Sequence, residues 1–287
     1  MVSLNRSTVF NHIPSLDELP NIAMAIESIK KETGDKVSVQ TANKFYQMHT
    51  KVDKPENEGD MGVLIQQLAG DEADVVYLTD NLITHIVSSE TWMLGVALVY
   101  GQTISDGKFS EIFAQEITFN GQNPVELQTP ICRVHSAINT RDTWGWGTIY
   151  VYQGTSSVTD GIPDTDSMVH LMNRQLNTGE NPNNVFAGHF TVPDGHYFIL
   201  KNSEIGQVRS NNSLFVDAEV QIAEYGKSFI TKRVLSGGNA GTITGIDDNL
   251  IYAPPNSTLR MWGHFNGSND ANEALANFSG YLGKIIN

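Results

Sequence analysis

The stretch from residue 185 to residue 201 constrains the fold of this chain more than any other. Two short runs of β-branched and aromatic residues lie on either side of Pro193-Asp194-Gly195. Proline presets φ, the Asp side chain supports a turn and Gly accepts a positive φ, so the stretch predicts a tight hairpin. Strand alternation places Phe190 and Val192 on one face and His189 on the other. A hairpin this apolar needs a second layer of strands to cover it.

The rest of the chain supplies strand patterns in abundance. Between Leu214 and Ile222, apolar and polar residues alternate, which predicts a strand with one buried and one wet face. Pro254-Pro255 interrupts any ladder at that point. Further strand-like runs occur at residues 229–235, 242–246, 259–265 and 278–286. This near-regular spacing without a helical period predicts a mainly β protein, an antiparallel β-sandwich or jelly roll.

The N-terminal region differs from the rest. Residues 1–14 are a polar arm, and residues 15–33 predict one amphipathic helix ended by Gly34. The apolar stripe of this helix includes Ile22, Ile26 and Ile29. The stripe can pack on the chain's own β-domain or dock on a neighbouring subunit, and the sequence favours neither. The charge-rich residues 35–60 predict an exposed connector.

These patterns suggest three parts. Residues 1–60 would be an N-terminal arm and helix that serve as a docking segment. Residues 61–135 would be a small β-rich domain, and residues 136–287 would be a β-sandwich or jelly-roll domain. The sequence does not decide whether 61–135 is separate from the sandwich that follows it.

Composition excludes several function classes. The formal net charge of −14 argues against a protein that binds nucleic acid or an anionic membrane. No apolar run approaches the length of about 18 residues that a membrane span needs, and the N-terminus has no signal-peptide pattern. Cys132 is the single cysteine, so no intramolecular disulfide can form, and it is expected to be a small buried hydrophobe. A charged fraction of 17% suits an extracellular or virion β-protein.

Candidate reactive groups are scattered. The loop that carries Asp160, Asp164 and Asp166 lacks calcium-loop spacing, and Asp217 with Glu219 is expected to form a solvated strand face rather than a glycosidase pair. The histidines show no metal-ligand spacing, and His189, His196 and His264 are expected on strand surfaces. We therefore expect no catalytic centre, no metal and no cofactor.

Three tryptophans are the remaining candidates for recognition. Trp144, Trp146 and Trp262 could form a platform on which a sugar ring stacks, or they could fill a subunit interface or a core. Interface or core is the favoured interpretation because Trp is enriched at protein contacts.

The order of four motifs resembles that of a group of virion proteins from tailed phages, frequent in marine and cyanobacterial phages. The motifs read Glu116-Ile-Thr-Phe-Asn-Gly-Gln-Asn-Pro-Val-Glu-Leu127, Ile131-Cys-Arg-Val-His-Ser-Ala137, Trp146-Gly-Thr-Ile-Tyr-Val151 and Ala187-Gly-His-Phe-Thr-Val-Pro-Asp-Gly-His-Tyr-Phe-Ile199. Each motif encodes strands and turns, and their shared order carries the resemblance, which covers roughly residues 80–287.

The resemblance implies a non-enzymatic structural component of the virion: a head decoration, a head fibre base, or a part of the tail or portal-proximal assembly. It implies contacts with other virion proteins, an oligomer, and no cofactor. One alternative is a carbohydrate-binding β-sandwich that uses the tryptophans for host adhesion. A glycan-degrading enzyme is the third hypothesis.

Overall fold

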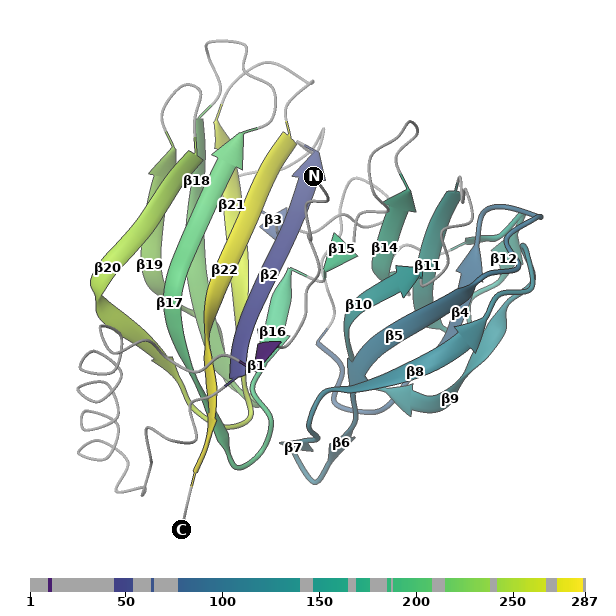
Figure 1. Ribbon diagram of the computed structural model, residues 1–287, viewed down its shortest axis with the longest axis horizontal. Coiled ribbons are helices and arrows are strands. Elements are labelled where there is room, and N and C mark those ends of the chain that lie inside the picture. Colours follow the sequence, from purple (N-terminus) through teal and green to yellow (C-terminus); the bar gives the residue numbers. More distant parts are fainter. Residues whose placement is uncertain are drawn as a thin grey trace.

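The computed structural model describes residues 10–11, 44–53, 63–64, 77–139, 147–164, 169–175, 185–186, 188–207, 215–237, 242–266 and 273–285. Its strands pair antiparallel throughout these residues and form two β-sandwiches (Figure 1). The predicted fold class, mainly β with antiparallel sandwich sheets, is confirmed. The predicted helix at 15–33 lies outside the described residues. Nowhere in those residues is there a helix with the length and apolar character that a membrane crossing requires.

Sandwich I is built from the middle of the chain. Its first sheet has the order β15 (Val185–Phe186), β10 (Arg133–Asn139), β5 (Val96–Gln102) and β8 (Phe113–Thr118). Its second sheet has the order β14 (Val169–Gln175), β11 (Gly147–Gln153), β4 (Ile83–Ser88) and β9 (Val125–Ile131). Two small hairpins project from it: β6 (Ile104–Ser105) with β7 (Lys108–Phe109), and β12 (Val158–Thr159) with β13 (Ile162–Pro163).

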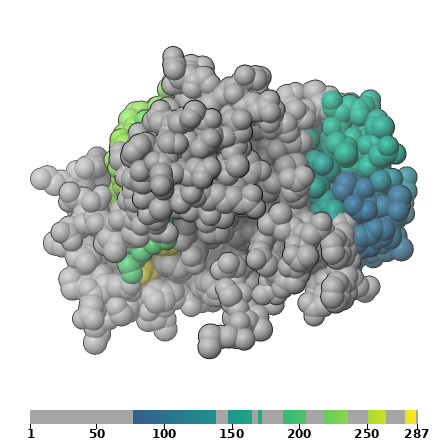
Figure 2. Space-filling model, turned by 90° about the horizontal axis from the view of Figure 1, so that it is seen from above, coloured from purple at the N-terminus to yellow at the C-terminus, as the bar shows by residue number. Residues whose placement is uncertain are grey.

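Sandwich II combines strands from both ends of the chain. One sheet has the order β1 (Phe10–Asn11), β2 (Lys44–Asp53), β22 (Glu273–Lys284), β17 (His196–Gln207) and β20 (Thr242–Ala253). The other has the order β16 (His189–Thr191), β21 (Ser257–Asn266), β18 (Phe215–Glu224) and β19 (Ile230–Gly237), with β3 (Val63–Leu64) also paired to β21. Seen from above, the blue and teal surface of sandwich I occupies one end of the molecule (Figure 2).

Each sandwich has its own apolar core. The sandwich I core joins residues of both its sheets, including Ile86, Val99, Val134 and Val151. The sandwich II core includes Phe190, Phe198, Leu259 and Phe278. Burying one such side chain contributes roughly 1.5–3 kcal/mol relative to leaving it exposed. Along β18 the predicted alternation is confirmed, because Ala218, Val220 and Ile222 are buried while Glu219 and Gln221 are only partly covered.

The predicted hairpin at 185–201 is wrong in its strand pairing. The turn itself exists, with Gly195 at φ +67°. However, β16 pairs with β21, whereas β17 pairs with β22 and β20 in the opposite sheet. Phe190 and Phe198 face each other across the core with ring centroids 4.9 Å apart. The chain therefore turns a corner between two layers, because both runs bury their apolar faces against one another instead of side by side.

The connector predicted at 35–60 is also wrong for residues 44–53. Lys44–Asp53 is the long strand β2, and every residue in it pairs with β22. The charged residues that follow Lys51 hid this strand, because its partner lies at the far end of the chain and no local pattern reveals it. The expected boundary at 135/136 falls within β10, which pairs with β5, while β11 beyond it pairs with β4. The division into independently folding domains stays a prediction.

The side chain of Gln115 links the two sheets of sandwich I along one edge. Edge strands β8 and β9 belong to different sheets. The buried amide of Gln115 on β8 donates to the Thr129 carbonyl at 2.9 Å and accepts from the Thr129 N–H at 2.8 Å. This arrangement satisfies backbone groups that an edge strand otherwise leaves open to pairing with another chain.

Substitution of Gly161 tests how closely the β12–β13 hairpin packs against the main chain at Ser88. Gly161 has φ +76°, and a Cβ there would collide with the Ser88 carbonyl oxygen; Gly226 has φ +74° with open space around it. We expect Gly226→Ala to cost about 1–2 kcal/mol of stability from the left-handed backbone alone. Gly161→Ala should cost about 1–3 kcal/mol more, because the main chain must move. Urea unfolding of both variants measures the difference, and equal losses would contradict this packing.

Candidate functional site

Two corners of sandwich II lie against each other and form a platform. One is the Pro193–Gly195 turn between β16 and β17, and the other is the Pro254–Asn256 turn between β20 and β21. The Val192 N–H donates to the Ser257 carbonyl at 2.8 Å, and the Asn256 N–H donates to the Val192 carbonyl at 3.0 Å. Asn256 has φ +58°, which an asparagine tolerates better than most residues. These bonds fix both corners as one surface.

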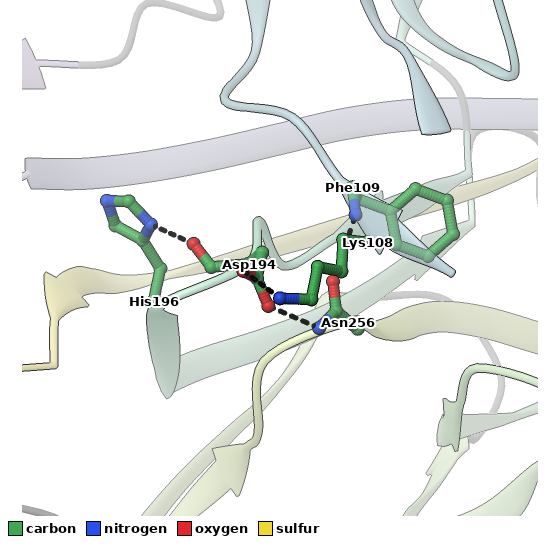
Figure 3. Close-up of polar contacts among 5 residues, drawn as sticks. All are labelled: Lys108, Phe109, Asp194, His196 and Asn256. Atoms are coloured by element: carbon green, nitrogen blue, oxygen red, sulfur yellow. Dashed lines mark hydrogen bonds and ion pairs between the residues drawn. The ribbon is translucent and has the colours of Figure 1, made fainter. Parts of the chain in front are cut away.

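The β6–β7 hairpin of sandwich I docks on this platform (Figure 3). The Phe109 N–H donates to Asn256 Oδ1 at 2.9 Å, and the Asp194 N–H donates to the Phe109 carbonyl at 2.9 Å. Asn256 Nδ2 donates to Asp194 Oδ1 at 2.8 Å, and Lys108 Nζ lies 3.7 Å from Asp194 Oδ2. We call Lys108, Phe109, Asp194 and Asn256 the corner clamp. It joins the two sandwiches through directional bonds to the main chain.

His196 extends the corner clamp. Its Nδ1 lies 2.9 Å from the Asp194 carbonyl, which can only accept, so Nδ1 carries the hydrogen (Figure 3). Its Nε2 lies 3.5 Å from the exposed carboxylate of Glu111. The ring is buried, so the prediction of a surface histidine is wrong at this position.

Next to the corner clamp lies a group of polar side chains, which we call the junction cluster: Arg133, His135 and His189, which are buried, and Tyr77, which is partly exposed. Arg133 is 5% exposed, and its Nη1 donates to the carbonyls of Leu78 at 2.8 Å and Cys132 at 2.9 Å. Its guanidinium also lies over the rings of Tyr77 and Phe109, at 5.3 and 4.9 Å from the centroids. Carbonyl oxygens and aromatic faces thus stabilise this cation.

The junction cluster brings an imidazole of each sandwich together. His135 on β10 and His189 on β16 have ring centroids 5.7 Å apart, and Tyr77 meets His189 edge-on at 5.6 Å. Both histidines are 2% exposed. His189 is therefore a junction residue and not the surface histidine that the sequence predicted. His264 has its side chain outside the described part of the chain.

A hydrogen-bond chain fixes the state of His135. Gln102 Nε2 donates to the Ser110 carbonyl at 2.8 Å, which leaves Gln102 Oε1 to face His135 Nε2 at 2.6 Å. Because this oxygen accepts, His135 carries its hydrogen on Nε2. Burial first and the charge of Arg133 second lower the pKa of His135 to about 3. The ring is neutral at physiological pH.

The same causes act on two further histidines. Burial, and then the neighbouring His135 and Arg133, hold the pKa of His189 well below its ordinary value. Burial and Arg133 lower the pKa of His170 on β14 to about 4. The junction therefore holds the permanent charge of Arg133 among imidazoles that are neutral.

Of the predicted recognition residues, the structure describes the side chain of Trp262 alone. Trp144, Trp146, Ile22, Ile26 and Ile29 lie outside the described residues. One face of the Trp262 ring is covered by the guanidinium of Arg260 at 3.9 Å, and the same guanidinium lies 3.8 Å from the Phe229 ring. Arg260 Nε also donates to Gln221 Oε1 at 2.8 Å. Trp262 is thus engaged with its own chain on that face.

Those candidate carboxylates whose side chains the structure describes do not gather at one place. Glu219 accepts hydrogen bonds from Gln221 and Thr231, while the side chain of Asp217 is outside the described part. Asp164 accepts from Thr159 across the β12–β13 hairpin. Among the residues that the structure describes, no group of three or more His, Cys, Asp or Glu side chains is placed to hold a metal ion.

The sequence did not single out the junction cluster, although one signal was present. In Ile131-Cys-Arg-Val-His, Cys132 and Val134 alternate with Arg133 and His135, so one face of β10 is apolar and the other polar. Cys132 lies in the sandwich I core as predicted, and Val134 lies there too. Nothing local indicates that β16 of the other sandwich covers the polar face.

Comparisons with known proteins give weak likenesses only. No family model matches the chain, and no curated protein sequence matches it. Among solved structures, an infectious bursal disease virus VP2 subviral particle is 12% identical, with 90% of this chain and 77% of that chain covered and a TM-score of 0.22. A structure of the Gx strain of that virus is 13% identical, with 90% and 76% covered and a TM-score of 0.22. These TM-scores are too low to indicate a shared fold or function.

Removal of the Asn256 side chain tests the corner clamp. Asn256→Gly keeps the positive φ without strain and leaves the Phe109 N–H without its acceptor. We expect a loss of about 1–3 kcal/mol in the free energy of unfolding. Asn123→Gly is the control, because Asn123 bonds only within its own exposed turn, and it should change stability by less than about 0.5 kcal/mol. Similar effects of both substitutions on chemical denaturation would contradict the clamp.

Cys132 offers a probe of burial. Its thiol donates to the Gln102 carbonyl at 3.3 Å, and burial raises its pKa to about 11. At pH 8 about one thiol in a thousand is then a thiolate, the reactive form. The thiol of the native protein should react with Ellman's reagent no faster than the protein unfolds. In about 6 M guanidinium chloride, which unfolds the protein, one equivalent of the coloured thiolate should be released at once. Rapid labelling of the native chain would show that this core is open.

Proposed function

We propose that this chain is a non-enzymatic structural component of a virus particle, which acts through protein–protein assembly. The observation that carries the proposal is the filled junction between the sandwiches. Two-domain enzymes commonly bind ligands at the domain interface. Here that interface is occupied by Arg133, His135 and His189, which are all buried, and by the corner clamp. Such a junction suits a rigid building unit better than a cleft that must admit a substrate.

The placement of the sequence motifs supports the same proposal. Glu116–Leu127 spans the end of β8, a turn and the start of β9; Ile131–Ala137 spans most of β10; and the last motif spans β16, its corner and the start of β17. Each of these three motifs therefore encodes an element of the scaffold. The motif order is the feature that this chain shares with the tailed-phage group.

The finer proposal follows the resemblance. Within the class of virion proteins, we propose a tailed-phage component: a head decoration, a head fibre base or a head–tail or tail assembly protein. Its partners would be copies of itself and other capsid, portal or tail subunits. Ile230 and Val234, 60% and 59% exposed on edge strand β19, are apolar side chains available for such contacts.

The competing candidate is a carbohydrate-binding adhesion module. Trp92 favours it, because this side chain is 45% exposed in the loop before β5. Trp262 favours it less, since Arg260 covers one face of its ring. A glycan array separates the two functions: selective binding that is lost in Trp92→Ala would favour adhesion.

Mass spectrometry of purified phage particles tests the main proposal. We expect this chain at a fixed copy number per particle, together with concentration-dependent self-association of the purified protein in sedimentation velocity. Capsid and tail proteins of known copy number in the same sample are the internal standard. Absence of the chain from particles, combined with a monomer at high concentration, would overturn the proposal.

A further inference from the structure

The junction cluster contains two buried titratable rings, which a contact with a structural role alone does not need. Each sandwich contributes one imidazole, and the two rings meet in a place that is closed to water. Among the residues that the structure describes, neither ring nitrogen of His189 has a hydrogen-bond partner. A neutral imidazole tolerates this environment at a modest cost, whereas a protonated one requires an acceptor or an opposite charge.

We propose that the junction is an acid-released latch, closed while His135 and His189 are neutral and opened when they take up protons. This inference concerns regulation and holds whether or not the chain is a virion protein.

The groups that face these rings supply little compensation for added charge. A hydrogen bond with the His189 backbone raises the pKa of His135, but burial and the charge of Arg133 outweigh it. The interactions that act on His189 come from His135 and Arg133 on β10, His170 on β14 and Arg260 on β21. Tyr77 adds a ring edge at 5.6 Å. None of these groups is a carboxylate, so a proton on either imidazole adds a cation near those of Arg133 and Arg260. On His189 this charge lies in sandwich II and faces Arg133 of sandwich I.

The direction with pH follows from the sign of the shifts. The closed junction holds the pKa of both histidines below the ordinary 6.5, so the open form binds more protons. The open-to-closed ratio therefore rises as pH falls below about 6.5, by up to about tenfold per pH unit for each histidine. For His135 this rise ends near pH 3, where the closed form also becomes protonated.

The sandwiches should separate before they unfold. Each sandwich has a large core cluster of apolar side chains. The corner clamp, in contrast, is a small set of hydrogen bonds with one exposed ion pair, in which the side chains of Lys108 and Asp194 are 67% and 42% exposed. Surface pairs of this kind contribute little stability. The weakest connection thus lies in the same place as the acid-sensitive groups.

Small-angle X-ray scattering of the full chain from pH 7.5 to pH 3.5 tests the latch, with far-UV circular dichroism as the measure of intact sheets. We expect the radius of gyration to rise below pH 6 while the dichroism stays constant. The slope of the transition should correspond to at least two protons taken up. In His189→Phe, which keeps an aromatic ring without a titrating nitrogen, the midpoint should move to lower pH and the slope should fall by about one proton.

His85→Phe is the matched control. His85 lies on β4, its Nδ1 is 2.8 Å from Thr84 Oγ1, and it is outside the junction; its variant should open as the parent does. His135→Gln repeats the test from the other strand if His189→Phe is already open at pH 7.5, and a lower midpoint or slope in this variant supports the latch. A parent that stays closed at pH 3.5, or parental midpoints and slopes in the variants, would overturn it.

Discussion

The buried guanidinium of Arg133 is the constraint on which the arrangement of the two sandwiches depends. This group stays ionised at every accessible pH, and a charge without water is costly unless other groups replace the water. The carbonyls of Leu78 and Cys132 and the rings of Tyr77 and Phe109 do so here. The same rings reach sandwich II, where Tyr77 meets His189 and Phe109 meets Tyr225 edge-on at 5.8 Å. The residues that stabilise the cation are therefore also the residues that hold the junction.

This constraint limits what the facing strand can carry. A carboxylate on β16 would pair with Arg133 and could bind it more strongly than the neutral ring of His189. The chain instead presents an imidazole, together with the hydrogen bonds of the corner clamp. The junction is thus held by many moderate contacts instead of one strong ion pair, and this is why its closure can respond to the protonation of individual groups.

The sequence predicted the layers better than the connections between them. The alternation of apolar and polar residues along β18 depends only on local sequence, and it correctly predicted that every second side chain is buried. The Asp106-Gly107 turn likewise gives the β6–β7 hairpin, with both residues at positive φ. Pro193-Asp194-Gly195 has the same local chemistry but joins two sheets, because the tertiary packing of Phe190 against Phe198 decides between a hairpin and a corner. The junction cluster could not be predicted, since its four members come from three segments that are far apart in the sequence.

The topology of sandwich II also dictates an order of events. Sandwich I occupies one stretch of the sequence, from β4 to β15, whereas β2 pairs along its whole length with β22. During synthesis the β4–β15 region can therefore collapse as soon as it leaves the ribosome, while β2 must wait until β22, on the far side of that region, has been made. Contacts of such long sequence separation form slowly, and unpaired strands that wait are prone to associate with other chains. The nascent polypeptide thus passes through a half-assembled stage in which β2 is unprotected, and a chaperone or a neighbouring nascent chain would meet it there first.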